Sequence, residues 1–139
     1  MQIESQIQRL WSRSGSEAMD LLLRRGNEAL EAENYAAALE HLTALTDHAP
    51  DFAEAWNARA TTFYLMEEYA LSISDIQRTL ALNPNHFGAL MGLATMFEQM
   101  GEDDLALRAM YAVRELNPNR PGIDDAISRL ERGAGAADL

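Results

Sequence analysis

The stretch "ALNPNHFGAL" (residues 81–90) decides the fold, because it places an Asn-Pro step between two apolar segments of helical character. A similar stretch, "ELNPN", recurs at residues 115–119. Proline has no backbone N–H to donate and disfavours helical geometry in the residue before it. We therefore expect one helix to end just before each of these prolines and another to begin just after it.

The prolines recur at a fixed spacing. Pro50, Pro84 and Pro118 are separated by 34 residues and then by 34 again, and a period of this size indicates a repeat architecture. Three segments, residues 19–52, 53–86 and 87–120, then align without a gap. Six further columns keep their character in all three: position 4 (Leu22, Trp56, Leu90), position 8 (Gly26, Ala60, Ala94), position 11 (Ala29, Phe63, Phe97), position 20 (Ala38, Ser72, Ala106), position 24 (Leu42, Ile76, Met110) and position 27 (Leu45, Thr79, Val113).

The columns predict two antiparallel helices in each segment. Positions 4, 8 and 11 share one face of a first helix, and positions 20, 24 and 27 share one face of a second. Positions 8 and 20 are always small, which allows the two helices to approach closely. Short polar turns at residues 32–34, 66–68 and 100–103 separate them, and Asp51, Asn85 and Asn119 are candidate caps for the helices that follow the prolines.

These columns resemble the tetratricopeptide repeat (TPR) family over residues 19–120, although Asp103 replaces the aromatic residue found at the same position as Tyr35 and Tyr69. The resemblance implies an all-α fold: an α-solenoid (α-α superhelix) of three antiparallel helix hairpins. It also implies a non-catalytic module, an adaptor or chaperone-like protein, that binds a peptide or helix of a partner protein in a concave groove lined by the first helices.

Both ends of the array carry further amphipathic segments. Residues 121–132 predict a C-terminal capping helix that buries Ile123, Ile127 and Leu130, since a solenoid must cover its last apolar face. We expect residues 133–139 to form a disordered tail. We expect residues 1–18 to form an N-terminal amphipathic helix and a linker. The apolar stripe of that helix consists of the candidate self-association residues Ile3, Ile7, Leu10 and Trp11.

Three destinations are open for that N-terminal helix. It caps the first repeat, lies in the protein's own groove, or pairs with another chain to give a homodimer, which would make structural self-assembly the alternative function. Whichever of these holds, Ser14 and Glu17 are a candidate capping box for the first repeat helix.

The charge of the chain limits its partners. The 139 residues include 22 acidic and 11 basic side chains, all of the latter arginine, for a net charge of -11. This excess of acid disfavours nucleic acid and anionic membranes as partners and favours a neutral or mildly basic protein or peptide.

There is no cysteine, no apolar run of the ~20 residues needed to span a membrane, and no secretory signal pattern in the first residues. The localisation is left open between cytoplasm and periplasm, and the arginine-only, alanine-rich composition is typical of a GC-rich bacterial genome.

The TPR resemblance also implies which residues line the groove, at positions 2, 5, 6, 9, 12 and 13. The candidate binding residues are Asp20, Leu23, Arg24, Asn27, Glu31, Glu54, Asn57, Thr61, Tyr64, Met91, Thr95 and Glu98. We expect Met91 to be exposed there, and Met100 and Met110 to lie in the core.

One TPR subclass binds the C-terminal carboxylate of chaperones through a set of lysine, asparagine and arginine side chains. Of that set only Asn27 is present here, because the other places hold Leu23, Ala58, Gly88 and Gly92. A chaperone tail is therefore not the expected ligand.

The sequence contains no recognisable catalytic or metal-binding motif. His41 and His48 lie seven residues apart on one predicted helix, but no third ligand is near them in sequence, and zinc sites take three or four. Phosphate loops, nucleophile elbows and H-E-x-x-H are missing as well. We expect no enzymatic activity, no metal and no cofactor.

Overall fold

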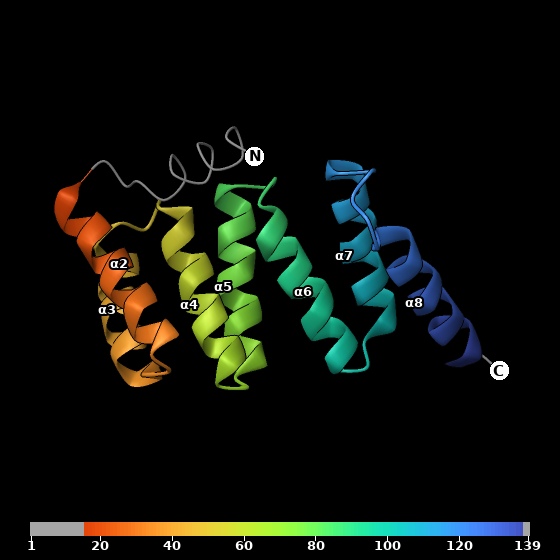
Figure 1. Cartoon of the computed structure of the whole chain (residues 1–139), viewed down its shortest axis with the longest axis horizontal. Helices are drawn as coiled ribbons and strands as arrows, with labels where there is room; N and C mark the ends of the chain where they lie inside the picture. The colour runs from red at the N-terminus through yellow and green to blue at the C-terminus, as the bar shows by residue number, and fades with distance from the viewer. Residues whose placement is uncertain (1–15, 138–139) are drawn as a thin grey trace. The chain divides into compact units, whose positions relative to one another are not determined.

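The computed structural model describes residues 16–137, which form seven α-helices and no strand (Figure 1). The helices are α2 (Glu17–Glu31), α3 (Tyr35–His48), α4 (Ala53–Leu65), α5 (Tyr69–Leu82), α6 (Phe87–Gln99), α7 (Asp103–Leu116) and α8 (Ile123–Ala137). This confirms the all-α fold and its three hairpins. The candidate self-association residues Ile3, Ile7, Leu10 and Trp11 lie outside the described residues.

The chain divides into two compact units at the Asn-Pro step that first indicated the fold. Unit 1 ends at Pro84 and contains the hairpins α2–α3 and α4–α5, whereas unit 2 begins at Asn85 and contains the hairpin α6–α7 and the helix α8. Helix α5 ends at Leu82, two residues before the proline, and α6 begins at Phe87.

Each hairpin turns through the same backbone motif. The residue at position 15 has a positive φ in all three repeats: 60° at Glu33, 62° at Glu67 and 78° at Gly101. The following N–H donates to a carbonyl five residues back, as from Asn34 to Ala29 at 2.8 Å, so the last carbonyls of each first helix are satisfied. Two of the three turns place a glutamate in a conformation that favours glycine.

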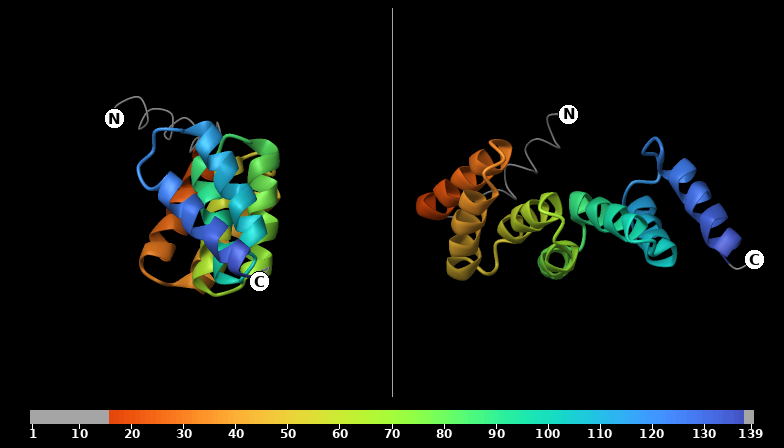
Figure 2. Two further views of the ribbon diagram at one scale, coloured as in Figure 1. Left: turned by 90° about the vertical axis from the view of Figure 1, so that its right-hand side faces the viewer. Right: turned by 90° about the horizontal axis from the view of Figure 1, so that it is seen from below.

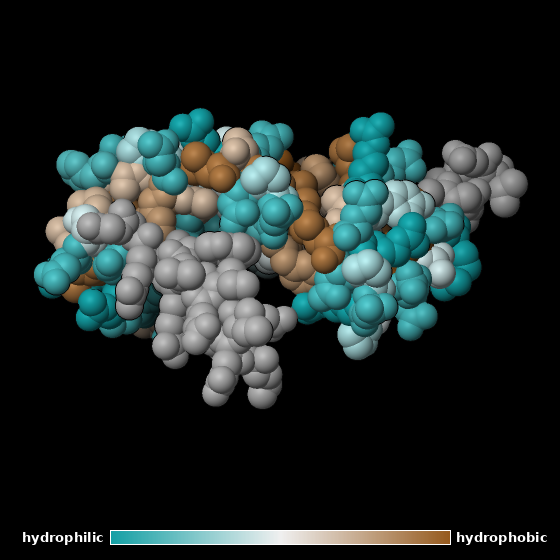
Figure 3. Space-filling view, turned by 90° about the horizontal axis from the view of Figure 1, so that it is seen from above, coloured by the Kyte–Doolittle hydropathy of each residue, from teal (hydrophilic) through white to brown (hydrophobic). Residues whose placement is uncertain are grey.

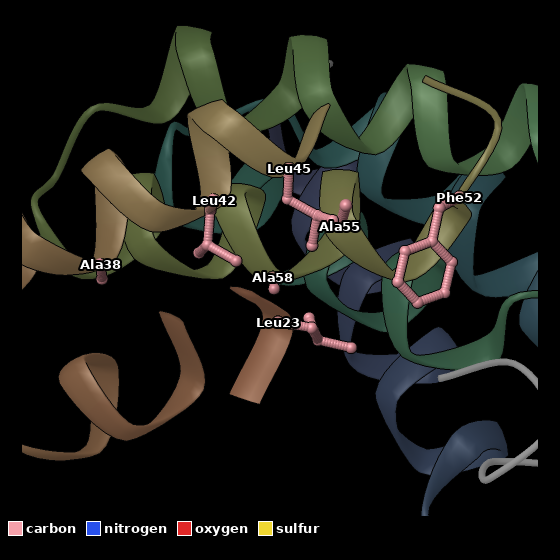
Figure 4. Packing of buried hydrophobic residues seen from close by; sticks show 7 residues of the cluster. All are labelled: Leu23, Ala38, Leu42, Leu45, Phe52, Ala55 and Ala58. Carbon is pink, nitrogen blue, oxygen red and sulfur yellow. The ribbon is translucent and has the colours of Figure 1, made fainter. Parts of the chain in front are cut away.

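The small columns allow close contact between the helices of a hairpin, as predicted. A Cβ added at Gly26 would lie 2.6 Å from Cδ2 of Leu42, so α2 and α3 touch where a side chain would clash. Leu42 belongs to the core cluster of unit 1 (Figure 4), which holds Leu23, Ala38, Leu42, Leu45, Phe52, Ala55 and Ala58. The remaining small residues of both columns are equally buried, with Ala60 at 2% and Ala106 at 0% exposure.

A polar network that the sequence analysis did not predict joins three helices of unit 1. Arg59 on α4 donates two hydrogen bonds to the carboxylate of Asp75 on α5, at 2.8 and 2.9 Å, and a third at 3.2 Å to Thr46 on α3. The side chains of Arg59 and Asp75 are only 18% and 5% exposed. The hydrogen bond to Asp75 raises the pKa of Arg59 above its ordinary value, so the guanidinium is charged at all physiological pH values.

Unit 2 ends in the predicted capping helix. Helices α7 and α8 lie side by side (Figure 2), and Ile123, Ile127 and Leu130 are each 3% exposed or less. The outward side is polar, and the surface at the α8 end of the view in Figure 3 is mostly hydrophilic. The helix continues through residues 133–137, where a tail was expected.

Several local expectations about core residues and helix caps were wrong. Met110 is buried as predicted, but Met100 is 48% exposed, because it is the C-cap of α6 and lies beyond its last buried turn. Helix α2 is capped by Ser16, whose hydroxyl accepts from Met19 N–H at 3.4 Å, and not by Ser14. The cap of α6 is the imidazole Nδ1 of His86, which accepts from Ala89 N–H at 3.1 Å, and not Asn85. The N-cap residue of α4 is Phe52, without a side-chain cap hydrogen bond, and not Asp51.

Candidate partner-binding surface

The predicted binding residues lie on the first helices of the repeats, and we call their surface the first-helix face. In unit 1 it comprises Asp20, Leu23, Arg24, Asn27, Leu30 and Glu31 of α2 with Glu54, Asn57, Ala58, Thr61, Tyr64 and Leu65 of α4; in unit 2 it comprises Gly88, Met91, Gly92, Thr95, Glu98 and Gln99 of α6. Helices α2 and α4 are in direct contact, so their residues form one surface within unit 1.

An apolar strip runs along the first-helix face of unit 1. Leu23 and Leu30 are seven residues apart on α2, as are Ala58 and Leu65 on α4, so each pair shares one side of its helix. Leu23 and Ala58 are 5% and 8% exposed and belong to the same core cluster. Leu30 is half-buried against that cluster and Leu65 is 45% exposed. Leu23 therefore supports the surface from below, and the accessible apolar part lies at Leu30 and Leu65.

Polar side chains flank this strip. Arg24, Asn27, Glu31 and Thr61 are exposed, while Asp20, Glu54, Asn57 and Tyr64 are half-buried. Thr61 donates its hydroxyl proton to the Asn57 carbonyl at 3.1 Å, and the Tyr64 ring lies 5.8 Å from that of Tyr69.

The first-helix face of unit 1 is acidic. Its carboxylates are those of Asp20, Glu31 and Glu54, and its only cation is Arg24. The field above it therefore favours a segment with net positive charge.

The corresponding face of unit 2 is partly used by the chain itself. Glu98 accepts two hydrogen bonds from Arg129 of α8, at 2.5 and 3.1 Å, and these bonds raise the pKa of Arg129 above its ordinary value. Met91 is half-buried, and Thr95 is exposed and donates to the Met91 carbonyl at 2.9 Å. Glu98 was expected to meet a partner, and the structure places it in an ion pair with the capping helix.

Among the described residues, no three histidine, aspartate or glutamate side chains converge as metal ligands would. Across the same residues, no helix combines the length and hydrophobicity needed to cross a bilayer.

Comparison with known proteins agrees with this architecture. The family model described as "Tetratricopeptide repeat" matches residues 23–73 and again residues 58–121. The chain belongs to the tetratricopeptide repeat family. TPR domains are modules through which proteins bind one another, which agrees with a face that offers polar and apolar side chains for contact.

A related protein and two solved structures extend the comparison. A TPR repeat-containing protein of Rhizobium etli is 38% identical over 134 residues, which cover 96% of this chain and 66% of that protein's length. The first TPR of Spaghetti (RPAP3), bound to the HSP90 peptide SRMEEVD, is 20% identical with a TM-score of 0.78 over 84% of this chain and 93% of that one. The Yersinia enterocolitica type III secretion chaperone SycD, in complex with a peptide of the translocator YopD, is 18% identical with a TM-score of 0.73 over 89% of this chain and 95% of that one.

Proposed function

We propose that this protein is a non-catalytic adaptor or chaperone-like module that holds a peptide or helix of a partner protein on its first-helix face. The observation that carries the proposal is the composition of that face in unit 1. Leu30 and Leu65 supply exposed apolar contact, and Asn27, Asn57 and Tyr64 beside them supply amides and a phenol that can pair with a backbone. Two proteins of the same fold, the RPAP3 domain and SycD, were solved with peptides bound.

The partner segment is neutral or mildly basic. On the first-helix face of unit 1 the three carboxylates outnumber the single arginine, Arg24, and Glu98, the only carboxylate on the face in unit 2, is already paired with Arg129. An acidic ligand would add like charge to this surface, and like charges at an interface oppose association.

A chaperone tail such as SRMEEVD does not fit this face. A carboxylate needs cationic or amide donors in a fork, and here the places that would supply them hold the buried Leu23 and Ala58 together with Gly88 and Gly92. We expect no binding of SRMEEVD in calorimetry at micromolar concentration. Measurable binding there would disprove this part of the proposal.

The proposal is tested by selecting peptides on the immobilised chain and measuring each on two variants. Asn27→Ala with Asn57→Ala removes two amides of the first-helix face, whereas Ser74→Ala with Gln77→Ala removes two exposed polar side chains of α5. We expect selected peptides to lose at least tenfold in affinity on the first variant, about 1.4 kcal/mol, and to keep it on the second. Equal affinity for both variants, with circular dichroism showing both folded, would contradict the proposal.

A further inference from the structure

The N-terminal residues carry an apolar stripe that needs a surface to cover it. Ile3, Ile7, Leu10 and Trp11 fall on one side of a helical projection, while Ser5 and Ser12 fall on the opposite side. An isolated helix of this length is marginal in water, so the stripe is useful only when it is packed against an apolar partner.

The front of the first repeat, which is the side of α2 that a preceding hairpin would cover, is not that surface. Positions 3, 7 and 10 of a first helix face the preceding hairpin, and in α8 these positions are Ile123, Ile127 and Leu130, all buried. In α2 the same positions hold Leu21, which is 37% exposed, and two exposed charged side chains, Arg25 and Glu28. The front of α2 is thus already suited to water, and a cap there would bury an arginine and a glutamate beneath an apolar stripe.

The length of residues 1–15 and their attachment to α2 would allow them to reach the first-helix face. They are followed by Ser16, which has extended backbone geometry and directly precedes α2. The polar run Ser12–Gly15 allows the chain to reverse, and a helix over the eleven residues before it would be about 17 Å long, within the ~22 Å length of α2. An antiparallel return along α2 would bring Ile3 and Ile7 towards Leu30 and Leu65, the accessible apolar part of the strip.

The charges are complementary as well. Residues 1–15 contain Arg9 and Arg13 against a single glutamate, so this segment has a net positive charge in a chain of net charge -11. The first-helix face of unit 1 carries the carboxylates of Asp20, Glu31 and Glu54 and one cation, Arg24. An amphipathic, mildly basic helix is also the kind of ligand that we propose for the partner.

We propose that residues 1–15 bind the first-helix face of unit 1 of the same chain and so compete with the partner protein. Only the competition with the partner rests on the proposed function. The docking itself is an intramolecular contact that can be measured without any partner.

Docking is tested with a nitroxide spin label on the Ser5→Cys variant, because the chain has no other cysteine and Ser5 lies opposite the apolar stripe. We expect the label to broaden the amide signals of residues 27–31 and of residues 61–65. Residues 61–65 lie on α4, which a cap on the front of α2 would not approach, so sharp signals there would overturn the proposal. Broadening in an isotope-labelled, cysteine-free chain mixed with unlabelled spin-labelled chain would assign the contact to a second copy and also overturn it.

Competition is tested with the selected peptides. Ile7→Asp with Leu10→Asp breaks the stripe, and Ser5→Asp with Ser12→Asp makes the same change in charge on the opposite side. If the segment covers the face about nine-tenths of the time, the first variant should bind peptide about tenfold more tightly than the unmodified chain, and the second should bind as the unmodified chain does. Equal affinity in all three would refute competition. Failure of every peptide to bind, with broadening at residues 61–65 observed, would refute the proposed function and leave the docking in place.

Discussion

Removing the carboxylate of Asp75 should destabilise unit 1 strongly. In Asp75→Ala the guanidinium of Arg59 loses two hydrogen bonds, of 2.8 and 2.9 Å, to a charged acceptor that is only 5% exposed. Hydrogen bonds to charged groups contribute about 1.5–3 kcal/mol each, and breaking a buried pair from one side costs about 3–5 kcal/mol. Arg59 is 18% exposed and keeps its bond to Thr46, so water and the hydroxyl compensate in part. We therefore expect a loss of about 3 kcal/mol.

The chain supplies its own control for this prediction. Repeat three places Leu93 and Ala109 at the positions that Arg59 and Asp75 occupy in repeat two. The double variant Arg59→Leu with Asp75→Ala should therefore recover most of the lost stability, because an apolar pair leaves no buried charge without a partner.

The measurement is urea unfolding followed by far-ultraviolet circular dichroism, with unchanged slopes required for a valid comparison. A loss below about 1 kcal/mol in Asp75→Ala would mean that water replaces the carboxylate and that the pair is not the structural contact we describe. A double variant as unstable as the single one would show that the stranded guanidinium is not the cause.

The remaining predictions concern local geometry, and thermal unfolding measures each. Gly26→Ala should lower the free energy of unfolding by about 1–3 kcal/mol, because its Cβ would lie 2.6 Å from Cδ2 of Leu42. Adding Leu42→Met should restore part of this loss, because the third repeat pairs alanine with methionine at these positions. Glu67→Gly should stabilise by about 0.5–1 kcal/mol, since φ is 62° there; a loss would mean that the turn is not strained. His86→Ala should cost about 1 kcal/mol by removing the cap of α6, and His86→Ser should cost less; equal losses would exclude a capping role.

The repeat architecture was predictable because every hairpin packs its two helices in the same way and therefore needs the same residue types at the same positions. Small residues at positions 8 and 20 permit the close contact seen between Gly26 and Leu42, and the prolines end the second helices. A single sequence therefore showed the hairpin pattern three times over, which is why the all-α repeat fold could be predicted from it.

The side-chain pairs were harder to predict, because they join residues that are distant in sequence. Arg59 and Asp75 are separated by 16 residues, and Glu98 and Arg129 by 31. The first pair had a signal that the sequence analysis overlooked: a charge of each sign at two positions where the third repeat has Leu93 and Ala109. The second pair depends on how α8 packs against α7, which no column of the repeat determines.

The most direct test of the central claim is to map where a selected peptide binds, using amide chemical shifts of the isotope-labelled chain. We predict that the largest changes fall on Asn27, Glu31, Asn57 and Thr61 of the first-helix face, with α3 and α5 nearly unchanged. Changes confined to α3, α5 and α7, with α2 and α4 unaffected, would contradict it.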